Sequence, residues 1–193
     1  NFRADILLTN ILMREGIIVD LRPLTDKFCG MLTIDEFETS ILVNKKHISV
    51  RRFFTIGHEF GHYFMHRNQS SYFLDEKGNI NGGANDDTLP LLEQQANAFA
   101  SELLMPTDVI HNLLNNRFNF YRIAKTINVS YEALKWRLVR YCIERYGLSN
   151  TGSISVVDDY IEKSKAKQHH TAKIFSLESS SFYFEINANI RSY

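Results

Sequence analysis

The feature that most constrains this chain is the segment His58-Glu59-Phe60-Gly61-His62, in which two histidines are four residues apart. On a helix this separation is about 400°, so both imidazoles leave the same face one turn apart and can bind one metal ion. Glu59 is rotated by about 100° from His58, which places it beside such an ion in a position suited to a general base. The structural alternative is a buried helix with two hydrogen-bonded histidines. An ionised glutamate on so apolar a segment argues against that alternative.

The residues around this motif predict a largely apolar, buried helix from about Val50 to His66, with Ser49 as its N-cap. Gly57 and Gly61 lie within it. Each glycine costs a helix roughly 1 kcal/mol relative to alanine, so we expect both to permit close packing of another element.

A catalytic zinc usually takes three protein ligands, so a third donor is expected downstream. Residues 90 to 105 predict a second helix, which Pro106 ends, and Glu93 shares one of its faces with small alanines that allow a close approach. Glu93 is therefore the best candidate. Glu102 follows nine residues later, about 900° or half a turn out of phase, so it cannot face the same metal. Asp86 and Asp87 remain weaker alternatives, because they fall in a predicted loop.

Two further residues near the motif are candidates for contacting substrate or stabilising an oxyanion. These are His66, one turn beyond His62, and Tyr63. A surface histidine at the helix end is an equally good interpretation of His66. The remaining histidines show no metal-ligand spacing; they are His47, His111, His169 and His170.

The rest of the first half predicts an α+β fold. A helix is expected over residues 2 to 14, with Gly16 as its stop, and three short apolar runs follow at residues 17–21, 28–34 and 41–43. Their connections are too short for helical crossovers, so they predict a small antiparallel sheet. Residues 68 to 90 have a loop composition and are expected to gate a cleft.

The second half predicts further helices. A short helix is expected over residues 108–114, followed by helices over 120–127 and 131–141 around a turn, with Ser130 as the cap of the last helix. This is helix-turn-helix spacing. The predicted domains are thus residues 1–106, a helical segment at 107–147, and a polar tail at 148–193 that has no assigned fold apart from a possible strand at 182–186.

The composition of the chain indicates the cellular compartment in which it is expected. Lys plus Arg and Asp plus Glu both total 22, so the chain as a whole has no charge bias towards nucleic acid or membrane. Cys29 and Cys142 form no CxxC pair, which favours free thiols in a reducing compartment. No apolar run approaches the ~18 residues of a membrane span, and the first residues lack a signal-peptide pattern. We therefore expect a cytoplasmic protein.

Two stretches together make a resemblance specific. Residues 49–66, which read SVRRFFTIGHEFGHYFMH, and residues 93–106, which read EQQANAFASELLMP, resemble the ImmA/IrrE family of zincin-like metallopeptidases in order and spacing. The resemblance covers about residues 1 to 147. It implies a zincin-like fold, zinc bound by His58, His62 and Glu93, and Glu59 as the catalytic carboxylate. A site with two histidines and one carboxylate can also hold manganese or iron.

Family resemblance also implies a substrate. Relatives relieve repression by cutting a helix-turn-helix (XRE-type) repressor of a phage, mobile element or stress operon, so such a repressor is the expected partner. One rival hypothesis is a DNA-binding regulator that uses residues 118 to 146, a view that the net charge of +4 over residues 107–150 (7 basic minus 3 acidic) permits. Another is a toxin-like regulatory protein with little peptidase turnover.

Overall fold

The structure is a computed structural model that describes residues 3–70, 72–76 and 90–179. The chain divides into two compact units. The first contains the residues up to Pro106 together with Ile127–Ala133, and the second contains Thr107–Thr126 and the residues from Leu134 onward.

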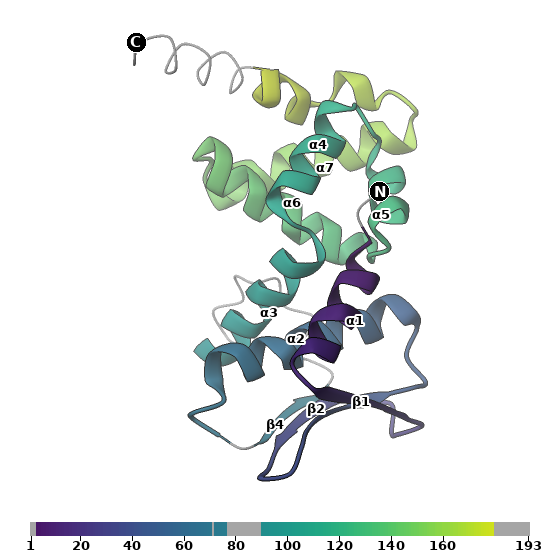
Figure 1. The fold of residues 1–193 in the computed structure, drawn as a ribbon. Coiled ribbons are helices and arrows are strands. Elements are labelled where there is room, and N and C mark those ends of the chain that lie inside the picture. The colour runs from purple at the N-terminus through teal and green to yellow at the C-terminus, as the bar shows by residue number, and fades with distance from the viewer. Residues whose placement is uncertain (1–2, 71, 77–89, 180–193) are drawn as a thin grey trace. The chain divides into compact units, whose positions relative to one another are not determined.

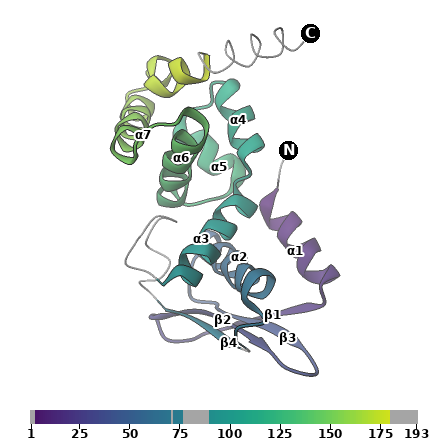
Figure 2. The same ribbon diagram turned by 90° about the vertical axis from the view of Figure 1, so that its left-hand side faces the viewer.

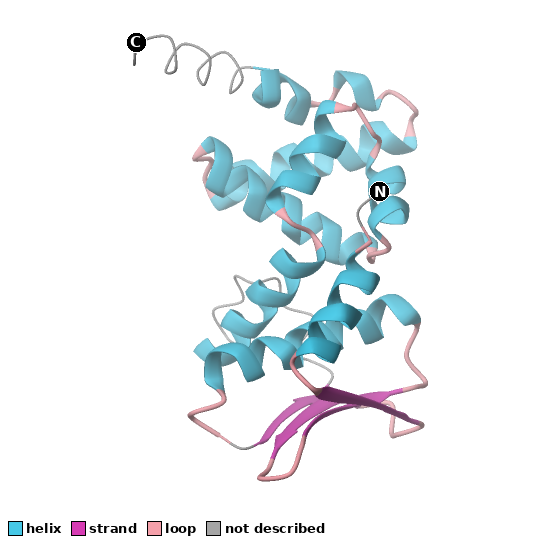
Figure 3. Ribbon diagram, viewed as in Figure 1, coloured by secondary structure: helices cyan, strands magenta, loops and turns pink. Residues whose placement is uncertain are grey.

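The described part of the first unit combines a small sheet with three helices, which confirms the α+β fold class. Helices α1, α2 and α3 cover one face of the sheet, as Figures 1 and 2 show from two directions. Secondary structure is coloured in Figure 3. The elements are α1 (Ala4–Arg14), β1 (Ile17–Arg22), β2 (Phe28–Ile34), β3 (Thr39–Asn44), α2 (Ser49–His66), β4 (Tyr72–Glu76) and α3 (Leu91–Leu104).

The sheet is mixed, so the prediction of an antiparallel sheet was wrong in part. Its strand order is β1-β3-β2-β4, with β1 parallel to β3 and the other two pairs antiparallel. The connection from β1 to β2 passes over the end of β3, so β2 lies two positions from β1 in the sheet. The chain then turns back, and β3 lies between β1 and β2. A parallel pair can therefore form without a helical crossover, which the prediction did not consider. Asn44 fixes this connection, since its side chain accepts from the Leu24 N–H at 3.2 Å and donates to the carbonyls of Thr25 and Phe28 at 2.8 and 3.0 Å.

Two boundaries around α2 differ from the sequence prediction. Ser49 is the first helical residue and not the N-cap; the cap is Ile48, whose carbonyl accepts from the N–H groups of Arg51 and Arg52 at 3.1 Å each. After α2, residues 72–76 of the predicted loop form β4, which pairs with β2. Residue 71 and residues 77–89 lie outside the described residues. The predicted gating role of this loop therefore stays a prediction.

Helices α2 and α3 pack closely through the two glycines of α2. A Cβ added at Gly61 would lie 3.3 Å from both the Cα and the carbonyl oxygen of Ala96 and 3.2 Å from Phe99. A Cβ at Gly57 would meet Ala100 at 3.5 Å, an ordinary van der Waals distance. The predicted close approach is therefore confirmed, and Gly61 is the tighter of the two positions.

This difference predicts opposite effects for two matched substitutions. Gly57→Ala should leave the free energy of unfolding unchanged or raise it by up to about 1 kcal/mol, because alanine favours the helix and fits. Gly61→Ala should lower it by about 1 to 2 kcal/mol, because its methyl group presses on the backbone of α3, which cannot yield like a flexible side chain. Urea unfolding of both variants measures the difference. Equal stabilities would show that α3 adjusts freely.

The second unit is helical. Its elements are α4 (Thr107–Asn115), α5 (Phe120–Ile127), α6 (Tyr131–Tyr146), α7 (Asn150–Lys165) and a 3-10 turn η1 (His169–Thr171), and residues 173–179 are also helical. The ends of α5 and α6 nearest the turn belong to the first unit. Ser130 caps α6 as predicted, because its hydroxyl accepts from the Ala133 N–H at 3.1 Å.

Helix α7 falls in the tail to which no fold had been assigned. Ser149 caps it by accepting from the Gly152 N–H at 3.1 Å. Tyr160 is fully buried and donates to the carbonyl of Phe118, while Ser164 accepts from the Phe120 N–H at 3.1 Å. Helix α7 packs within the second unit partly through hydroxyl groups. Its sequence therefore shows only a weak apolar periodicity.

The helix over residues 173–179 is held by a buried carboxylate. Glu178 accepts hydrogen bonds from the hydroxyls of Tyr141, at 2.5 Å, and Tyr146, and its Oε2 lies 3.1 Å from His111 Nδ1. The possible strand at 182–186 lies outside the described residues. Within residues 3–70, 72–76 and 90–179, no helix has the length and apolar character needed to cross a membrane.

Candidate metal centre

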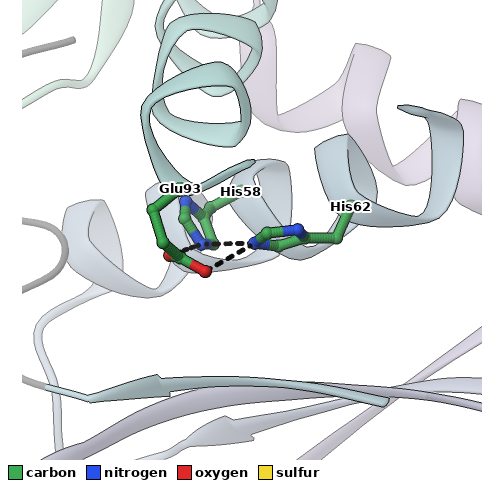
Figure 4. A group of neighbouring side chains, drawn as sticks. All are labelled: His58, His62 and Glu93. Carbon is green, nitrogen blue, oxygen red and sulfur yellow. Dashed lines mark hydrogen bonds and ion pairs between the residues drawn. The ribbon is translucent and has the colours of Figure 1, made fainter. Parts of the chain in front are cut away.

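Two neighbouring helices bring three potential metal ligands together. His58 and His62 project from α2, and Glu93 projects from the first turn of α3 towards both rings (Figure 4). One ligand atom from each lies within 4.8 Å of the others. The structure thus places Glu93, the favoured third donor, beside the histidine pair.

The donor–donor distances fit a single tetrahedral ion. His58 Nε2 and His62 Nε2 are 3.1 Å apart, and Glu93 contributes Oε2 at 3.2 Å from the former and Oε1 at 3.4 Å from the latter. Donors placed tetrahedrally at about 2.0–2.2 Å from zinc lie roughly 3.3–3.6 Å from one another. The observed separations are close to this range, so the residues present fit a metal ion.

Burial and charge set the protonation of these groups. His58 and His62 are 0% and 1% exposed. Burial lowers the pKa of His62 despite the opposing effect of Glu93. Burial acts to raise the pKa of Glu93, but hydrogen bonding and charge interaction with the two histidines outweigh it and bring this pKa to about 2. An ionised carboxylate beside a neutral imidazole is the state that binds a metal cation.

Helix α3 also orients His58. The Nδ1 atom of this ring lies 2.9 Å from Asn97 Oδ1, and both side chains are buried. A carbonyl oxygen only accepts, so Nδ1 carries a proton, and when the ring is neutral Nε2 is the nitrogen left to bind a metal. The sequence analysis did not foresee this hydrogen bond between Asn97 and His58.

Glu59 occupies a separate place on α2. Its side chain is fully buried, and Oε1 lies 3.1 Å from where a Cβ of Gly30 would be. The carboxylate therefore runs towards the backbone of β2. Any side chain at position 30 would also collide with Thr55, whose Cγ2 is 2.4 Å from the same point. Gly30 thus makes room for Glu59 between α2 and the sheet, a requirement that no sequence motif revealed.

His66 lies behind the His62 ring. It is 2% exposed, with Nδ1 3.0 Å from His62 Nδ1 and Nε2 2.9 Å from Gln95 Oε1 of α3. Tyr63 is half-buried; its ring stacks on Phe60 and lies under the guanidinium of Arg67. The predicted contacts of His66 and Tyr63 with substrate remain predictions.

Phe73 of β4 covers a face of His62. The two rings stack with centroids 4.3 Å apart and planes 15° apart. This residue was missed because β4 was read as part of a loop. An isolated Tyr-Phe-Leu run in a polar stretch was the available indication of a strand.

The structure describes only some of the other acidic and histidine candidates. Glu102 is exposed on α3, consistent with its helical phase, and Asp86 and Asp87 lie outside the described residues. In the second unit, His111 contacts Tyr141 and Glu178, and His169 Nε2 is 3.1 Å from the carbonyl of Arg117.

The chain matches a known protein family. The family model of the IrrE N-terminal-like domain, a peptidase family, matches residues 22–139, which is more than half of the chain. The matched range contains the three clustered donors and Glu59. No curated protein matches the chain.

Proposed function

Because the chain belongs to the peptidase family defined by the IrrE N-terminal-like domain, we propose that it is a zinc-dependent endopeptidase with His58, His62 and Glu93 as metal ligands and Glu59 as general base. The observation that carries this proposal is the convergence of the three donor residues at 3.1–3.4 Å, close to the spacing of ligands on one tetrahedral ion. Manganese or iron suits the same donor set.

When bound at these three residues, the metal supplies Lewis acidity that activates water and polarises a peptide carbonyl. Glu59 takes the proton of the attacking water and delivers it to the leaving amine as the peptide bond breaks. Its burial beside Gly30 fixes the carboxylate on the helix that carries both histidines. His58, in turn, is kept in one orientation by Asn97.

The sheet offers a docking edge for a substrate. Strand β4 is an edge strand, paired with β2 on one side, and among the described residues no strand pairs with its other side. An extended peptide can add to such an edge through main-chain hydrogen bonds. Because Phe73 of β4 stacks on His62, a peptide paired with β4 would pass close to the proposed metal centre.

We propose a helix-turn-helix repressor as the substrate and the cytoplasm as the setting. Support comes from the resemblance of residues 49–66 and 93–106 to the ImmA/IrrE family, whose members act on such repressors. The test is incubation of the zinc-loaded protein with a purified helix-turn-helix repressor, using an unrelated unfolded protein as comparison. Cleavage of the repressor at a defined bond supports the proposal. Absence of cleavage in both proteins, with zinc bound, would exclude the peptidase function.

Direct DNA binding is less well supported. Basic side chains of α6 are engaged within the second unit: Lys135 pairs with Asp158 at 2.8 Å, Arg140 pairs with Glu144 at 2.7 Å, and Arg137 is buried and donates to Thr107. Cations held in this way are poor phosphate contacts. A toxin-like role without turnover has no specific observation in its favour.

A further inference from the structure

His62, His66 and Gln95 form a chain of hydrogen bonds, and its direction follows from the acceptor at its Gln95 end. It begins at Gln95, whose Oε1 lies 2.9 Å from His66 Nε2. A carbonyl oxygen can only accept, so His66 Nε2 carries a proton. A neutral His66 then has an unprotonated Nδ1, which must accept the proton of His62 Nδ1 across their 3.0 Å contact.

This direction decides which nitrogen of His62 is free. A neutral His62 with a proton on Nδ1 has a lone pair on Nε2, the atom that lies 3.4 Å from Glu93 Oε1 and 3.1 Å from His58 Nε2. The opposite tautomer would point a hydrogen at the place of the metal. Ligand tautomers in metal sites are commonly set by a partner on the other ring nitrogen.

We propose that His66 and Gln95 are positioning residues that hold His62 in its metal-binding tautomer and orientation. For His62 they do what Asn97 does for His58, and both arrangements take their outer acceptor from α3. Phe73 completes the arrangement by stacking on His62. His66 therefore acts through His62, in contrast to the sequence-based hypothesis that it contacts substrate. The inference rests on the metal site proposed above.

A matched pair of substitutions separates this role from simple packing. Leucine and asparagine are similar in size, but the asparagine Oδ1 replaces the accepting Nδ1 of His66 and leucine offers no acceptor. We expect His66→Leu to weaken zinc binding by about 10- to 100-fold, and His66→Asn to retain most of the wild-type affinity. Gln95→Leu, at an exposed position, should cause a smaller loss in the same direction.

The measurement is the zinc dissociation constant of the full chain, obtained by competition with a chromophoric chelator and repeated with cobalt(II), whose visible spectrum reports the coordination geometry. Met65→Leu, a substitution at an exposed neighbour on α2, is the control and should bind as wild type. Urea unfolding of the metal-free chains reports whether each variant folds.

The outcomes are distinct. Unchanged affinity in His66→Leu, or equal losses in His66→Leu and His66→Asn, would overturn the positioning role. If His66→Leu does not fold, Gln95→Leu decides: a loss of affinity supports the proposal, and wild-type affinity overturns it. A wild-type chain that binds no zinc would instead overturn the proposed function and, with it, this inference.

Discussion

Replacing Glu59 by glutamine is expected to lower the rate of peptide cleavage by about 10²- to 10⁴-fold, the usual contribution of a positioned general base. Glutamine keeps the size of the side chain, which is needed because Glu59 is fully buried against Gly30. Its amide cannot accept the proton of the attacking water. Zinc affinity should stay near that of the wild type, because Glu59 is not one of the three clustered donors.

This result is measured as the cleavage rate at saturating zinc together with the metal content of the purified variant. Glu102→Gln is the matched control, since it makes the same chemical change at an exposed position of α3 and should leave the cleavage rate unchanged. Full activity in Glu59→Gln with zinc still bound would refute the assignment of Glu59. Loss of zinc together with activity would instead place Glu59 in the metal site.

Much of this site is predictable from sequence because it depends on helical phase. The spacing of His58 and His62, and the register that selects Glu93 over Glu102, are properties of regular helices and need no tertiary information. The packing of α3 against Gly61 is likewise indicated by the cost of a glycine within a helix. Helical phase gives no information about contacts with elements that are distant in the sequence. The room that Gly30 makes for Glu59 and the stacking of Phe73 on His62 both depend on how the sheet folds.

The sheet and the C-terminal helices were harder to predict for physical reasons. The parallel pairing of β1 with β3 depends on a chain path over the end of β3, which Asn44 stabilises through three hydrogen bonds. A single buried asparagine leaves no periodic pattern. Helix α7 buries Ser153 and Ser164 beside its apolar side chains, and Gly152 lowers the helix propensity of its first turn. The sequence of α7 therefore resembles that of a polar linker, and the helix is hard to predict without the elements against which it packs.

The second large effect is expected at Glu93, where removal of the carboxylate should nearly abolish metal binding. An outer-sphere partner of a metal ligand contributes about 10- to 100-fold in affinity, and loss of a ligand should exceed this. Glu93→Ala leaves His58 and His62 as the remaining donors of the cluster among the described residues and removes the negative charge that faces both rings at 3.2 and 3.4 Å. Glu93→Gln keeps the size and one oxygen, so it should retain more affinity than alanine.

Zinc-dependent stability provides a second measure of the same change. A ligand that binds only the folded chain at 100 times its dissociation constant stabilises it by about 2.7 kcal/mol. The wild type should show this gain in urea unfolding at a fixed free zinc concentration, and Glu93→Ala should show almost none at that concentration. Asp86→Ala and Asp87→Ala test the weaker ligand candidates. If either of these loses zinc binding and Glu93→Ala retains it, the third ligand comes from residues 77–89, and the 3.2 and 3.4 Å contacts of Glu93 are ion pairs of the metal-free protein alone.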